Sequence, residues 1–192
     1  MFRSALHGIR RSLSAVLGAS AQRISEDRRV LEREILPSFA RRSDAHRVLF
    51  VGCAAYTQRY GELFVDREYW TIDPVPRRRL YGSERHIVDR LENLANHVEP
   101  EYFDVIICNG VLGWGLNSPD DAEAAFAACR QHLRAGGELV VGWNDVAPRN
   151  RVKPEDISAL RRFEPSGCEH GQQSRIRIDA PHRHVFDFYR KR

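Results

Sequence analysis

The chain has 192 residues, of which 42% are hydrophobic and 29% are charged, the composition of an ordinary globular domain with a full core. No apolar run is long enough to cross a membrane as a helix, so a membrane-spanning class is excluded. The four cysteines have neither metal-ligand nor redox spacing, which argues against a disulfide framework and predicts a reducing, cytoplasmic setting.

The net charge of +4 is concentrated at the N-terminus. Residues 1–46 carry nine arginines against five acidic residues, whereas residues 47–192 balance 21 basic residues with 21 acidic ones. A nucleic-acid-binding domain usually carries an excess of positive charge on its working face, so no nucleic acid partner is expected. The charge and the apolar pattern together predict a basic helical arm over 1–46 and one further domain over 47–192.

The arm begins with apolar residues at helical spacing, from Phe2 to Leu17, and its first 25 residues contain four arginines and no acidic residue. We favour a helix that packs on the domain or covers a ligand site. A peripheral helix on an anionic membrane and an organellar transit peptide remain open. A second helix is predicted at Glu26–Leu36, with Leu31, Ile35 and Phe39 facing inward, and Pro37 ends or kinks it.

The domain begins with a βαβ unit over 47–73. A buried strand, Val48–Val51, ends at Gly52; a helical stretch follows, and a second strand, Tyr69–Ile72, ends at Asp73. Glycine after the first strand allows the backbone to approach a ligand closely. Asp73 follows Gly52 by about the twenty residues at which nucleotide-binding units place a ribose-binding carboxylate.

The remaining pattern alternates strands with helices and then ends in two strands. This order predicts a parallel sheet covered on both faces, with an antiparallel edge at the C-terminus. The expected strands are 86–88, 103–108, 138–143, 174–178 and 184–189, and the expected helices are 91–98, 122–133 and 154–160.

Three segments of the sequence resemble a known family. They are VLFVGCA followed by WTID, the strand FDVIICNGVL, and LRAGGELVVGW. In this order they resemble the class I S-adenosylmethionine-dependent methyltransferases. The resemblance implies an α/β fold with a Rossmann-like, doubly wound, mostly parallel seven-stranded sheet whose last strand is inserted antiparallel.

The same resemblance implies residues that bind S-adenosyl-L-methionine. Gly52, Cys53 and Ala54 would lie under the methionine part, Asp73 would bind the ribose hydroxyls, and Asn109 with Gly110 would lie near the methionine end. Around the adenine would lie Asp89, Arg90 and Leu91. The family loop usually has further glycines where this chain has Ala54 and Tyr56, and Tyr56 would close over the cofactor.

Candidate catalytic residues are Trp114, Asp145 and His170, with His182 as a further base candidate. Trp114 and Asp145 follow the fourth and fifth strands, where ligands of open α/β sheets bind. Equally, Trp114 could pack against the sheet edge and Asp145 could cap a turn. No metal is expected, because the spacing of His170, His182 and His184 matches no zinc pattern.

The resemblance implies methyl transfer to a small-molecule, sugar or lipid-linked acceptor. Two other classes stay open. The chain could be an oxidoreductase of the NAD-binding type, although that fingerprint needs a third small residue where Thr57 stands. It could also be a catalytically inactive partner protein with the same fold.

Overall fold

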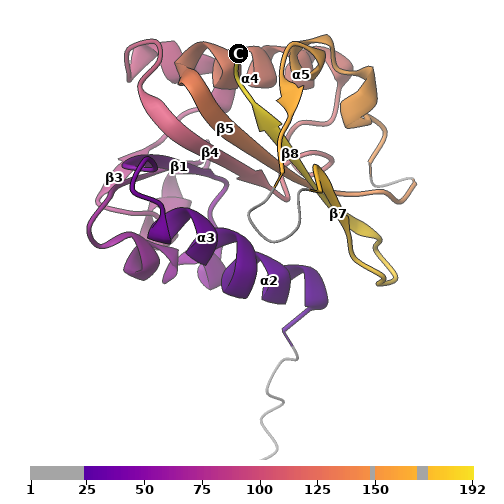
Figure 1. Cartoon of the computed structure of the whole chain (residues 1–192), viewed down its shortest axis with the longest axis horizontal. Helices are drawn as coiled ribbons and strands as arrows, with labels where there is room; N and C mark the ends of the chain where they lie inside the picture. Colours follow the sequence, from indigo (N-terminus) through magenta and orange to yellow (C-terminus); the bar gives the residue numbers. More distant parts are fainter. Residues whose placement is uncertain (1–23, 148–149, 168–172) are drawn as a thin grey trace, which may run out of the picture.

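The computed structural model describes residues 24–147, 150–167 and 173–192, and its centre is one twisted mixed sheet (Figure 1). The strands at the centre of the sheet, 47–51, 103–109 and 133–144, contain apolar runs whose side chains are buried on both faces. Its strands are β1 (Arg47–Val51), β2 (Glu68–Ile72), β3 (Arg85–Ile87), β4 (Phe103–Asn109), β5 (Leu133–Asn144), β6 (Glu164–Pro165), β7 (Arg175–Arg177) and β8 (His184–Arg190).

The strand order is β3-β2-β1-β4-β5-β8-β6, with β7 also paired to β8. Strands β1 to β5 are parallel, and β8 is antiparallel to β5. This confirms the predicted fold class. The expected count of seven strands was too low by one, because β7 pairs with Val185–Asp187 and β6 with Tyr189–Arg190, so that two short strands share one edge of β8.

One helical segment covers the face of the sheet that carries Phe50. It consists of α2 (Glu26–Val30), a π-helical turn η1 (Leu31–Ile35) and α3 (Leu36–Arg41). Pro37 does not end this helix, as one of the two predicted outcomes required; instead it follows an irregular π turn. The wider π turn directly before Pro37 accommodates the hydrogen bond that proline cannot donate, and the helix continues to Arg41.

The crossovers between the first strands are 3-10 turns, and the helices predicted there were wrong in type. They are η2 (Ala55–Thr57), η3 (Tyr60–Phe64), η4 (Pro76–Tyr81) and η5 (Leu91–Asn96). Aromatic packing fixes the first crossover: the ring centroids of Phe50 and Tyr60 are 5.3 Å apart, and those of Phe64 and Tyr69 are 5.0 Å apart. The turns η2 and η3 cover little of the sheet face that carries Phe50, which explains why the N-terminal helix lies over that face.

The opposite face is covered by α4 (Pro119–His132), η6 (Pro154–Asp156) and α5 (Ser158–Arg161). Ser118 caps α4 by accepting a hydrogen bond of 3.1 Å from the backbone N–H of Asp121, as its sequence predicts. Strand β5 begins at Leu133, earlier than expected, because the chain passes directly from α4 into the sheet through Gly136, whose φ is +74°.

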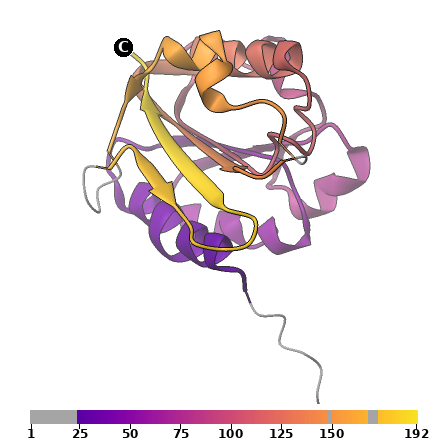
Figure 2. The same ribbon diagram turned by 90° about the vertical axis from the view of Figure 1, so that its right-hand side faces the viewer.

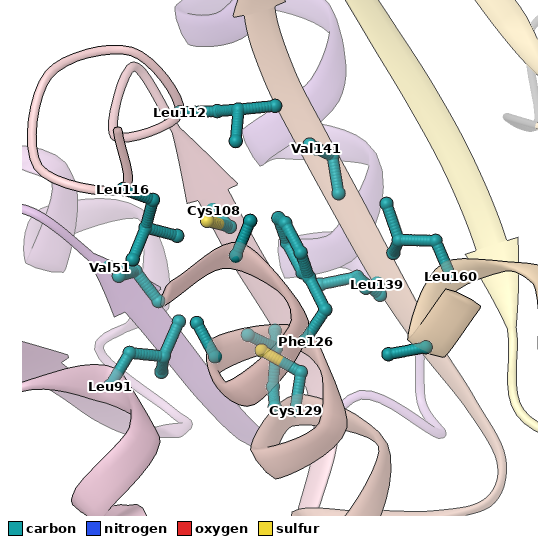
Figure 3. Close-up of a cluster of buried hydrophobic side chains, with 14 of the residues drawn as sticks. Val51, Leu91, Cys108, Leu112, Leu116, Phe126, Cys129, Leu139, Val141 and Leu160 are labelled. Carbon is teal, nitrogen blue, oxygen red and sulfur yellow. The ribbon is translucent and has the colours of Figure 1, made fainter. Parts of the chain in front are cut away.

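The sheet therefore separates two hydrophobic clusters. Figure 2 shows the N-terminal helical segment on one side of the sheet and the helices drawn in orange and red on the other. On the α4 side, Phe126 and Cys129 point from the helix toward Cys108 and Val141 on the strands (Figure 3). On the other side, the predicted inner face of the N-terminal helix is confirmed. Its side chains Leu31, Ile35 and Phe39 are buried in the same cluster as Phe50 and Phe186.

The helix predicted from Phe2 to Leu17 lies outside the described residues, and the boundary at residue 46 stays a prediction. Within the described ranges, no helix has the length and apolarity needed to cross a bilayer.

Candidate functional site

The carboxyl ends of the parallel strands converge on one cavity of about 730 Å³. It opens where the strand order reverses between β1 and β4, the usual ligand position in an open α/β sheet. Its walls come from the residues that follow β1, β2, β3, β4 and β5, with further side chains from α2 and from the turn before β8.

The floor of the cavity is backbone at Gly52. This residue has φ +87°, and a Cβ built on it would lie 2.9 Å from Cγ1 of Val111. Both observations require glycine, because L side chains rarely adopt this conformation and no space exists for one. Its N–H donates to the carbonyl of Ile72 at 2.9 Å, which fixes the turn beside the end of β2.

Asp73 presents a buried carboxylate to this floor, with 1% of the residue exposed. Its Oδ2 accepts hydrogen bonds from the Cys53 N–H at 2.8 Å and from Nη1 of Arg78 at 3.1 Å. Its Oδ1 accepts one from the Val75 N–H at 2.9 Å. Three donors therefore compensate for the desolvation of one charge.

A second carboxylate, Asp89, lies at the far end of the cavity. Its Oδ1 accepts from the Arg90 N–H at 2.7 Å and from Nδ2 of Asn93 at 2.8 Å, and its Oδ2 lies 2.8 Å from Nε2 of His97. The hydrogen bonds from Asn93 and His97 lower the pKa of Asp89 to about 2, so the group is ionised at neutral pH. Leu91 supplies a buried apolar wall beside it.

At the opposite end, a polar cluster is built over Gly142. Nδ1 of His184 lies 2.7 Å from Oδ1 of Asn144, and Nε2 lies 3.1 Å from Oδ1 of Asn109. A Cβ on Gly142 would lie 1.9 Å from Oδ1 of Asn109 and 3.0 Å from Nε2 of His184. Glycine at this point of β5 is what allows side chains from β4 and β8 to meet across the strand.

Helix α2 forms the wall above this cluster. Asp27, in its first turn, lies 3.0 Å from Nε2 of His182, which stands in the turn before β8. Arg28 lies over the ring of Tyr56 at 4.9 Å from the ring centroid, which holds that crossover residue against the helix. Segments from both ends of the chain therefore complete one cavity.

Comparison with known proteins supports the predicted resemblance. A family profile described as a methyltransferase domain matches residues 49–141, the stretch from β1 to β5 that carries the cavity. Over this stretch the chain is similar to methyltransferases, which supports the predicted resemblance to the class I S-adenosylmethionine-dependent family. No curated protein matches the chain.

Solved structures of methyltransferases share the fold. The N-methyltransferase NodS from Bradyrhizobium japonicum, in complex with S-adenosyl-L-homocysteine, has a TM-score of 0.66 and 17% identity, over 94% of this chain and 97% of that one. A TehB-like methyltransferase from Corynebacterium glutamicum has a TM-score of 0.59 and 17% identity, over 96% and 95%.

A third such structure is the 1,6-didemethyltoxoflavin-N1-methyltransferase from Burkholderia thailandensis, with bound 1,6-didemethyltoxoflavin and S-adenosylhomocysteine. Its TM-score is 0.56 and its identity is 18%, over 100% of this chain and 92% of that one. At these identities the likeness shows the fold alone.

The structure brings together every residue that the methyltransferase resemblance assigned to the cofactor. All ten line the cavity: Gly52, Cys53, Ala54, Tyr56, Asp73, Asp89, Arg90, Leu91, Asn109 and Gly110.

The candidate catalytic residues are not brought together in the same way. Trp114 lines the cavity with 59% of the residue exposed. Asp145 does not line this cavity, and its Oδ2 lies 3.9 Å from Nη1 of Arg177; its role as a base stays a prediction. His170 lies outside the described residues.

Sequence analysis missed four functional candidates that line the cavity: Asp27, Arg78, Asn144 and His184. Asn144 and His184 carried a usable signal, since they end β5 and begin its antiparallel neighbour and so must lie side by side. Asp27 carried none, because the docking of α2 is a tertiary event.

The cavity fits the nucleoside cofactor of the family. Its volume lies within the range of small-molecule sites, and it offers a close-approach glycine, a buried carboxylate and a second ionised carboxylate in the expected order. Burial and the charge of Asp73 raise the pKa of the Cys53 thiol to about 11, so Cys53 stays neutral beside them.

Proposed function

We propose that this chain transfers the methyl group of S-adenosylmethionine to a small-molecule acceptor. One observation carries the proposal: the ten residues named for the cofactor from family resemblance, spread from residue 52 to residue 110, all line one cavity. If the chain used this fold for an unrelated function, these ten positions would not need to line one cavity and also keep the residue types that the cofactor requires.

Each part of the cofactor has a matching part of the wall. The backbone at 52–54 takes the methionine part, Asp73 takes the ribose hydroxyls, Asp89 lies at the adenine end with Leu91 against the ring, and 109–110 lie at the methionine end. Arg78 already occupies Oδ2 of Asp73, so binding of the ribose exchanges this half-exposed ion pair for hydroxyl hydrogen bonds. Because Arg78 is half exposed, its guanidinium can turn to solvent while the ribose hydroxyls take over its hydrogen bond to the buried carboxylate.

The small-molecule class rests on the size of the cavity and on the solved neighbours. The Burkholderia enzyme holds a small heterocycle as its acceptor, and NodS is likewise an N-methyltransferase. With about 730 Å³ available, the cavity has room for a compact acceptor beside the nucleoside. A sugar or a lipid-linked acceptor would need to extend outside it, and both remain outcomes of an acceptor screen.

Calorimetry with S-adenosylmethionine, S-adenosylhomocysteine and NAD tests the proposal. We expect micromolar binding of the first two, on the order of −8 kcal/mol, and no binding of NAD. Asp73→Ala should remove most of this affinity, because charge-assisted hydrogen bonds to the ribose depend on that carboxylate.

Asp66→Ala is the matched control, since this aspartate is exposed and lies outside the cavity. Asp73→Asn, which keeps the side-chain volume, separates loss of charge from loss of fold. Wild-type affinity in both Asp73 variants, or preference for NAD, would contradict the assignment.

A further inference from the structure

Beyond the family positions for the cofactor, the cavity has a second half with its own titratable groups. It is lined by Asp27, Asn144, His182 and His184, next to Asn109 at the methionine end. The two histidine rings lie 6.3 Å apart, and each has a different environment. Histidines that line a cavity beside a carboxylate are candidates for acid and base roles.

His184 is held neutral and is not free to accept a proton. Burial lowers the pKa of its imidazole to about 4. Both ring nitrogens lie within hydrogen-bond distance of the amides of Asn109 and Asn144. A neutral imidazole donates from one nitrogen and accepts at the other, so one of the two amides must turn its NH2 group toward the ring. His184 therefore orders the cavity wall and Asn109.

His182 lies against a carboxylate, whereas His184 lies against two amides. Its Nε2 lies 3.0 Å from Oδ1 of Asp27, which leaves Nδ1 as the second ring position. Burial alone would raise the pKa of the Asp27 carboxyl, but hydrogen bonds from Ser25 and His182 oppose it, and the pKa is lowered. An ionised carboxylate on Nε2–H orients the ring and stabilises the imidazolium that forms when Nδ1 takes a proton.

We infer that Asp27 and His182 form the general-base pair of this enzyme, and that its acceptor carries a proton on the nucleophilic oxygen or nitrogen. The inference rests on the proposed function and deepens it. In the transfer, the acceptor atom bonds to the methyl carbon, the methyl–sulfur bond breaks with its electron pair on sulfur, and the acceptor's proton moves to Nδ1 of His182.

The surroundings of the pair favour a compact planar acceptor. Tyr56 and Trp114 both line the cavity, and aromatic side chains present flat apolar faces to a ring. A phenol or a heteroaromatic N–H compound combines such a ring with a proton that a histidine can remove. A neutral alkylamine would need no base and would leave the pair without use.

The charged and titratable groups that face His182 are Asp27 from α2 and His184 from β8, and Tyr56 with Arg28 lies beside Asp27. A positive sulfonium placed at the methionine end adds a charge that S-adenosylhomocysteine lacks. Nuclear magnetic resonance can follow the titration of the His182 ring carbon in each complex. We expect the His182 midpoint to be lower by about one pH unit with S-adenosylmethionine than with S-adenosylhomocysteine.

Two further measurements define the pair. Asp27→Asn should lower the His182 midpoint in both complexes, because the charge that stabilises the imidazolium is lost. The His97 resonance is the internal control, since His97 bonds Asp89 at the adenine end and should not distinguish the two ligands. A His182 midpoint that is equal in the two complexes, with both ligands bound, overturns the inference and leaves the proposed function standing. Failure of both ligands to bind removes the proposed function instead.

Transfer of labelled methyl from S-adenosylmethionine to a panel of phenols and heteroaromatic N–H compounds gives the kinetic counterpart. His182→Gln should slow transfer by roughly 10²- to 10⁴-fold, remove the acidic limb of the kcat/KM profile, and leave the affinity for S-adenosylhomocysteine within twofold. His46→Gln, an exposed histidine outside the cavity, should match the wild type. Turnover by His182→Gln at the wild-type rate contradicts the base role.

Discussion

His184 links the cavity to stability, because a neutral buried imidazole makes folding dependent on pH. Its folded pKa of about 4 lies below the ordinary value of 6.5, so between these limits the unfolded chain binds a proton that the folded chain does not. The stabilisation is complete above pH 6.5 and is lost as pH falls toward 4.

Urea unfolding between pH 7 and pH 4.5 measures this loss. We expect the free energy of unfolding to fall by on the order of 1 kcal/mol per pH unit in this window, with a smaller contribution in the same direction from His86. His184→Gln should flatten the dependence, whereas His46→Gln should keep it. An equal slope in wild type and His184→Gln would contradict the neutral state of His184.

Gly142 is the residue over which Asn109 and His184 meet, so a single methyl group there should disturb both. In Gly142→Ala the new Cβ would collide with the amide of Asn109, and we expect a loss of about 1–3 kcal/mol in unfolding free energy and weaker binding of S-adenosylhomocysteine. Gly115→Ala is the matched control, because its Cβ would meet nothing nearer than a carbonyl at 3.9 Å. Calorimetric affinity and thermal unfolding of the two variants check the expectation.

The residues proposed for the cofactor could be placed from the sequence, whereas Asp27 and His182 could not be placed together. Gly52 and Asp73 directly follow two strands that local apolar runs define. The carboxyl ends of these strands lie at the crevice, so both residues must lie there too. Asp27 and His182 are 155 positions apart in the chain, and only the docking of a helix on a hairpin brings them together. For Asp145 the strand end was predicted correctly, but a strand end does not determine the direction in which the following side chain points.

Among the elements, strands were predicted better than helices. Apolar runs such as 103–108 mark a buried strand whatever surrounds them, whereas the segments at 55–64 and 91–96 carry helical spacing but form 3-10 turns. In the first of these, Tyr60 and Phe64 are inserted between sheet and helix, and aromatic packing decides the backbone geometry. Tertiary contacts override propensity in such short segments.

The N-terminal helix shows the same limit. Its inward residues could be predicted from spacing, but its course past Pro37 depends on a π turn that no spacing rule reports. The consequence is functional, since a helix that stopped at Leu36 would lose the packing of Phe39 that holds α2 and Asp27 over the cavity.

Two deletions distinguish the helix that covers the sheet from the residues that precede it in the chain. Among the residues of the N-terminal segment that the structure describes, from 24 onward, buried side chains begin at Val30; deletion of residues 1–22 should therefore leave the melting temperature and the affinity for S-adenosylhomocysteine unchanged. Deletion of 1–41 should prevent folding, because it exposes Val48 and Phe50 to solvent. Circular dichroism and calorimetry on the two truncations decide this, and loss of fold in the shorter deletion would show that the first residues are structural.

The position of β8 delays completion of the sheet during synthesis on the ribosome. Strand β8 follows β5, β6 and β7 in the chain, yet it lies between β5 and the two short strands. Until it emerges, the nascent chain presents the long edge of β5 without a neighbour, a template for association with other chains. His182 and His184 emerge with that same segment, so a nascent chain that has not reached β8 is prone to association and lacks part of its cavity wall.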